Sequence, residues 1–67
     1  MKLLRPLSPR QSDVLRNYCA GMNDKESGHA LGIRPCTMKV HWRIILRKFR
    51  ARTRGQAVVF WVRMRRY

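Results

Sequence analysis

Residues 37–49, TMKVHWRIILRKF, contain seven apolar side chains interspersed with four Lys and Arg side chains. Wound as a helix at about 100° per residue, this segment places four apolar residues on one stripe, with His41 at its margin. The stripe consists of Met38, Trp42, Ile45 and Phe49. A second stripe, which also contains Val40, consists of Lys39, Arg43, Arg47 and the following Arg50. The pattern predicts a helix that buries one face and presents cations with one small apolar group on another, which suits a DNA groove.

The length and the cysteine content indicate one small domain of a reducing compartment. A chain of 67 residues is near the lower limit at which a single core is stable. Cys19 and Cys36 are too few for a disulfide scaffold, so they are expected to be free thiols or to form one bridge with each other. No apolar run approaches the ~20 residues of a membrane span, and the N-terminus lacks the apolar core of a signal peptide.

The charge is strongly basic and unevenly distributed. Sixteen Lys and Arg residues stand against three acids, which gives a formal net charge of +13. Asp13, Asp24 and Glu26 all lie early in the chain, and no acid occurs from Ile33 to Tyr67. Cations without internal partners imply a polyanion outside the chain. Nucleic acid is the first choice, and an anionic membrane surface or an acidic protein are the alternatives.

Capping signals divide the chain into helices. Ser8, Pro9 and Gln11 form a helix start with a capping box. Asn23 or Asp24 is expected to cap a second helix. We expect a single domain over 1–67, with an N-terminal arm at 1–7 and helices at 8–21, 24–31, 35–50 and 54–66. The stretch AVVFWV at 57–62 also has strong strand propensity, but its basic continuation favours a helix and no partner strand is visible.

The turn between the second and third predicted helices contains Gly32, as in a helix-turn-helix. Further residues follow one pattern in register: LSPR at 7–10, Val14-Leu15, Ala20-Gly21, Lys25-Glu26, LGI at 31–33, Thr37, Lys39, His41, Ile45, Lys48, Arg54 and Gln56-Ala57. Together they resemble the LuxR/FixJ-type (GerE-like) helix-turn-helix domain over residues 7 to about 58. The resemblance implies an all-α fold of four helices. It also implies that the third helix enters the major groove and that the fourth mediates dimerisation on pseudo-palindromic DNA.

By position, the resemblance assigns base contacts to Lys39, Val40 and Arg43. Lys and Arg can pair with guanine O6 and N7, and Val40 can lie against a thymine methyl group. Phosphate contacts are expected from Thr37, from Lys25 and Lys48 more loosely, and from the surrounding cations Arg34, Arg47, Arg50, Arg52 and Arg54. The dimer contact is expected at Val58, Trp61, Val62 and Arg65. His41 is interpreted as a packing and hydrogen-bonding residue rather than as a reader of bases.

The chain departs from the family pattern at several positions, where Gln11, Asp24 and Arg34 replace the usual Glu, Asn and Ser. Ser27-Gly28 stands where Ile-Ala is usual. Glycine within a helix costs about 0.5–1 kcal/mol, loss of the Ser cap about 1 kcal/mol, and Ser27 forfeits about 2 kcal/mol of apolar burial if enclosed. The second helix is therefore expected to depend on packing, dimerisation or DNA.

The leading interpretation is a sequence-specific, DNA-binding transcriptional regulator that acts as a homodimer. We expect it in the cytoplasm, at the nucleoid, of a bacterium or phage. Only six residues precede LSPR, so the chain is either a fragment or, since it starts at Met1, a free-standing regulator controlled by its amount or by a protein partner. One alternative is an interaction protein that pairs with another LuxR-type regulator, and RNA polymerase is a further candidate partner. The other alternative is a nonspecific architectural nucleic-acid binder.

An enzyme or a metal site is not expected. Cys19, His29, Cys36 and His41 lack the paired spacing of zinc ligands. The three acids and two histidines form no acid/base pair or nucleophile site. The sequence therefore predicts neither catalysis nor a cofactor.

Overall fold

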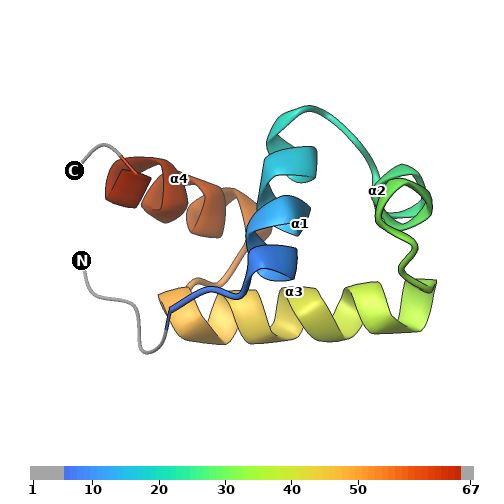
Figure 1. The fold of residues 1–67 in the computed structure, drawn as a ribbon. Coiled ribbons are helices and arrows are strands. Elements are labelled where there is room, and N and C mark those ends of the chain that lie inside the picture. Colours follow the sequence, from blue (N-terminus) through green and yellow to red (C-terminus); the bar gives the residue numbers. More distant parts are fainter. Residues whose placement is uncertain (1–5, 66–67) are drawn as a thin grey trace.

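A computed structural model describes residues 6–65, and four helices make up most of this range (Figure 1). They are α1 (Pro9–Cys19), α2 (Asp24–Leu31), α3 (Pro35–Phe49) and α4 (Arg54–Arg65). No strand occurs among the described residues, so the expected all-α fold is confirmed and residues 57–62 are helical. Residues 1–5 of the expected arm, and the expected last residue of the fourth helix, Arg66, lie outside the described range.

Side chains cap the first two helices as reciprocal boxes. Ser8 Oγ accepts from the Gln11 backbone N–H at 3.2 Å, and Gln11 Oε1 accepts from the Ser8 N–H at 3.0 Å. Asn23, the first of its two candidates, caps α2, because its Oδ1 accepts from the Glu26 N–H at 2.8 Å. Helix α1 ends at Cys19, two residues before the expected end.

Helices α2 and α3 each end at a residue with a left-handed backbone conformation. Gly32, with φ of +68°, caps the C-terminus of α2, as the sequence predicts. Arg34 occupies the N-cap of α3 without a side-chain hydrogen bond to the helix, so the Ser cap is indeed lost. At the other end of α3, Arg50 adopts a left-handed φ of +53°. Thr53 Oγ1 then accepts from the Gln56 N–H at 3.1 Å and starts α4.

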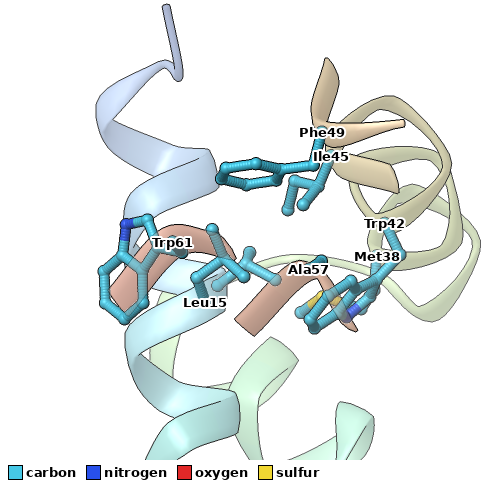
Figure 2. Packing of buried hydrophobic residues seen from close by; sticks show 8 residues of the cluster. Leu15, Met38, Trp42, Ile45, Phe49, Ala57 and Trp61 are labelled. Atoms are coloured by element: carbon cyan, nitrogen blue, oxygen red, sulfur yellow. The ribbon is translucent and has the colours of Figure 1, made fainter. Parts of the chain in front are cut away.

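Helix α3 is the element on which the other three pack, since it contacts α1, α2 and α4. Figure 1 shows these three on one side of α3, which leaves the opposite side of α3 open. The core contains Val14, Leu15, Met38, Trp42, Ile45, Phe49, Ala57 and Trp61. Figure 2 shows the α3 side chains gathered toward Leu15, Ala57 and Trp61. The predicted apolar stripe of α3 is therefore the buried one.

The unusual Ser27-Gly28 pair is explained by two contacts of α2. Ser27 is 4% exposed, and its Oγ accepts a hydrogen bond from Asn17 Nδ2 of α1 at 3.2 Å. A Cβ added to Gly28 would lie 2.7 Å from the carbonyl oxygen of Ile33. A polar contact thus replaces apolar burial at residue 27, and a close backbone approach occupies the space that an alanine would need at residue 28.

We predict that Gly28→Ala lowers the stability of the domain. The helix-propensity gain of about 0.5–1 kcal/mol is outweighed by displacement of the turn backbone, so a net loss of about 1–3 kcal/mol is expected in urea unfolding. The matched control is Gly55→Ala in α4, where an added Cβ meets nothing within 4 Å. A Gly28→Ala variant as stable as the Gly55→Ala variant would contradict the close approach.

Candidate nucleic-acid interface

The open side of α3 presents a row of cations. Lys39, Arg43, Arg47 and Arg50 are all exposed. At about 100° per residue they lie roughly a quarter to half a turn around the helix from the buried stripe. Within residues 6–65, none of these cations forms an ion pair.

All three acids lie on α1 and α2, and each binds a group of the domain itself. Asp13 lies 3.9 Å from Arg10 and 3.2 Å from Arg16. Glu26 Oε1 accepts from the Asn23 N–H at 3.0 Å. Asp24 binds a cation of α4, described below. The exposed face of α3 therefore keeps its full positive charge.

Three of the residues predicted to contact phosphates are exposed. Lys25 lies at the start of α2, Arg34 in the α2–α3 turn and Thr37 at the start of α3. Together with Arg47, Arg50 and Arg52, which are also exposed, they extend the basic surface beyond both ends of residues 39–43, where base contacts are expected.

Lys48 is engaged inside the domain. Its Nζ donates to Gln11 Oε1 at 2.7 Å and to the Pro6 carbonyl oxygen at 2.9 Å. The ammonium group thus ties the C-terminal part of α3 to α1 and to the segment before it. The structure gives Lys48 a structural role that the sequence pattern does not indicate.

Arg54 is also engaged, in a group that joins all four helices. Its guanidinium donates two hydrogen bonds of 2.8 Å to the Asp24 carboxylate, and its Cζ lies 4.5 Å from the Trp42 ring centroid. The Tyr18 ring meets the same indole edge to face, with centroids 5.1 Å apart. We call Tyr18, Asp24, Trp42 and Arg54 the Trp42 cluster.

The expected dimer residues of α4 divide between core and surface. Trp61 is 4% exposed and belongs to the core, and Val58 is half-buried against it. Arg65 is exposed, with its guanidinium carbon 4.6 Å from the Trp61 ring centroid. Val62 is exposed, and so is Val59, which the sequence does not assign to the dimer contact. Met64 is also exposed, but it lies on another side of α4. Val59 precedes Val62 by three residues, a spacing that places both on one helix face.

The apolar side chains on the open side of α3 are Val40, which is 46% exposed, and Ile44, which is 37% exposed. Only Val40 was expected to be a contact residue. His41 is half-buried, and its Nδ1 has no hydrogen-bond partner among the described residues, so the hydrogen bond expected of it is not formed through that atom.

The described residues were also compared with the requirements of a disulfide, a metal site and a membrane-spanning helix. Cys19 and Cys36 are exposed free thiols and form no bridge. Residues 6–65 contain no cluster of three or more His, Cys, Asp or Glu that could hold a metal ion. None of the described helices is long and apolar enough to cross a membrane.

We predict that Arg54→Lys destabilises the domain by about 1 kcal/mol, because lysine loses both the bidentate fork and the stacking on Trp42. The loss of stability is modest because the ion pair is partly exposed and therefore screened. Thermal unfolding followed by circular dichroism measures the effect. Arg47→Lys, at an exposed position of α3, is the control and is expected to change stability by less than about 0.5 kcal/mol. Equal behaviour of the two variants would argue against the Trp42 cluster.

Comparison with known proteins identifies the family of this chain. The family described as bacterial regulatory proteins, luxR family, matches residues 5–61. The nitrate/nitrite response regulator protein NarP of Escherichia coli K12 is 36% identical over 59 residues, which cover 88% of this chain and 27% of NarP. The uncharacterized transcriptional regulatory protein YxjL of Bacillus subtilis 168 is 34% identical over 62 residues, which cover 92% of this chain and 28% of YxjL.

A third relative is YhjB of Escherichia coli K12, named as a candidate HTH-type transcriptional regulator. It is 37% identical over 59 residues, which cover 88% of this chain and 30% of YhjB. The chain thus spans less than a third of the length of these relatives. No solved structure matches it at a significant level. The matched family profile covers most of the chain, including all of α1, α2 and α3, and the chain therefore belongs to the LuxR family of bacterial regulatory proteins.

Proposed function

We propose that this chain is a sequence-specific DNA-binding regulator of transcription that binds as a dimer with α3 in the major groove. The observation that carries the proposal is the open side of α3, where Lys39, Arg43, Arg47 and Arg50 are exposed and unpaired by any acid of residues 6–65. This is a surface for a polyanion at the bacterial nucleoid. The two relatives named as transcriptional regulators, YhjB and YxjL, support the same function.

The shape of the domain fits a groove. The major groove of B-DNA is about 12 Å wide and admits one α-helix. Helix α3 has 15 residues, which makes it about 22 Å long at 1.5 Å per residue. Because α1, α2 and α4 lie on one side of α3, its other side is free to enter the groove (Figure 1).

Base reading is proposed for Lys39, Val40 and Arg43, which lie within two turns at the middle of that side. Lys39 and Arg43 are four residues apart, so both can reach base edges from one helix face. Backbone contacts are proposed for Lys25, Arg34 and Thr37 near one end of α3 and for Arg47, Arg50 and Arg52 near the other. Such contacts fix affinity and register without reading sequence.

Dimerisation is proposed through the exposed apolar face of α4 that contains Val59 and Val62, which are 47 and 39% exposed. Two copies joined in this way would place two α3 helices on successive half-sites. The same face favours a second candidate function, in which the chain pairs with another LuxR-type regulator and changes that regulator's activity. RNA polymerase is a further candidate for such contacts.

The base-reading proposal predicts that the purified chain enriches a short, two-fold symmetric motif from random duplexes at about 150 mM salt. Preference over random DNA should reach at least ~10³. Lys39→Ala and Arg43→Ala should each lose about 1–3 kcal/mol of discrimination at one guanine position, because each removes a guanine contact. Sequencing of the selected pools and titration of the best duplex measure both effects.

The matched control is Arg10→Ala on α1, an exposed arginine on the packed side of α3, which should leave the enriched motif unchanged. Steep salt dependence without any enriched motif would instead identify a nonspecific architectural binder. Unaltered motifs in both α3 variants would rule out reading by Lys39 and Arg43.

The dimer proposal predicts that Val59→Asp prevents two copies from pairing, because it places a charge in an apolar contact. On a duplex with both half-sites, the variant should lose cooperative binding, whereas its affinity for a single half-site should stay within about twofold of the unaltered chain. Sedimentation and titration measure the two effects. Met22→Asp, at an exposed apolar position after α1, is the control. If Val59→Asp still pairs and binds cooperatively, the α4 face is not the dimer contact.

A further inference from the structure

The open side of α3 is not uniformly basic. Thr37, Val40 and Ile44 are all exposed on it, and none carries a charge. We call these three residues the methyl strip, because each is β-branched and carries at least one methyl group. Ile44 is 37% exposed although isoleucine is among the residues most often buried.

Helix geometry places the methyl strip beside the cations rather than among them. At about 100° per residue, its three members fall within about 60° of one another on one flank of the open side. Lys39, Arg43 and Arg50 fall within about 40° of one another on the other flank, and Arg47 lies between the two groups. The open side therefore presents parallel apolar and cationic rows.

A partner for this surface must combine negative charge with apolar groups. An apolar protein surface would have to accept the unpaired cations alongside the strip, which costs desolvation energy. The major groove of DNA meets both requirements, because phosphates line it and the C5 methyl group of thymine projects into it. Charge complementarity thus selects DNA as the occupant.

The separation of Val40 and Ile44 along α3 also agrees with the separation of base pairs in DNA. Val40 and Ile44 are four residues apart, which is about 6 Å along the helix axis. Base pairs of B-DNA are about 3.4 Å apart, so the two side chains are separated by about two base-pair steps. One helix can therefore meet methyl groups of two thymines within one half-site.

We propose that Ile44 is a specificity-determining residue, which together with Val40 reads the C5 methyl groups of thymines next to the guanines read by Lys39 and Arg43. The inference rests on the proposed function and deepens it. It assigns a preference for thymine to a residue that the family pattern does not place at the bases.

The test uses the duplex enriched from random sequence, with each thymine replaced in turn by deoxyuridine, which removes one methyl group and no hydrogen-bonding group. For the unaltered chain, deoxyuridine at one position of the half-site should weaken binding about fourfold, the effect expected for one buried methyl group. For Ile44→Ala the thymine and deoxyuridine duplexes should bind equally at that position. Val40→Ala should lose the preference at a second position instead.

Lys39→Ala is the matched control, because it should weaken binding to all these duplexes while keeping the fourfold ratio between thymine and deoxyuridine. Equal binding of both bases by the unaltered chain, or an enriched motif without thymine, would overturn the inference and leave the proposed function standing. An Ile44→Ala variant that keeps the full ratio would also overturn it. Failure to enrich any motif would overturn both the inference and the proposed function.

Discussion

The orientation of α3 depends on the contacts of one buried side chain, Trp42. The indole is 3% exposed, receives the Tyr18 ring from α1 and lies under the guanidinium of Arg54 from α4. Arg54 in turn holds Asp24 at the start of α2 through two hydrogen bonds of 2.8 Å. Apolar burial favours many arrangements of four helices, whereas a bidentate pair and an edge-to-face contact have narrow geometry. The Trp42 cluster therefore fixes the positions of the other helices around α3.

The exposed face of α3 follows from this burial. Because one side of the helix holds Met38, Trp42, Ile45 and Phe49, the residues half a turn away must face solvent or a partner. Asp24 ties the second helix to Arg54 of α4, and the turn from α2 into α3 passes over Gly28, where an added Cβ would meet the Ile33 carbonyl oxygen. A displacement of α2 would move Lys25 relative to α3. The packing at these positions thus sets which groups can act together on one ligand.

Local signals made much of the fold predictable. The capping residues Ser8, Gln11 and Asn23 act over three or four positions, and Gly32 fills a left-handed position that its type favours. Contacts between distant residues leave no such signal. Arg54 lies 30 residues from Asp24, and Lys48 lies 37 residues from Gln11, so both cations look free in the sequence although the structure engages them. On α4, six consecutive apolar residues at 57–62 give no clear period, so the sequence does not separate the buried Trp61 from the exposed Val59.

The charge distribution links folding to binding. Three acids cannot neutralise sixteen cations, and none of the three pairs with the exposed cations of α3, so the self-repulsion of the domain is large on that face. Added salt screens this repulsion and stabilises the free domain, but it also weakens binding to a polyanion. DNA relieves the same repulsion while adding its own binding free energy to the stability of the folded state. In a domain this small, with stability of only a few kcal/mol, the ligand of α3 therefore also supports the fold that presents it.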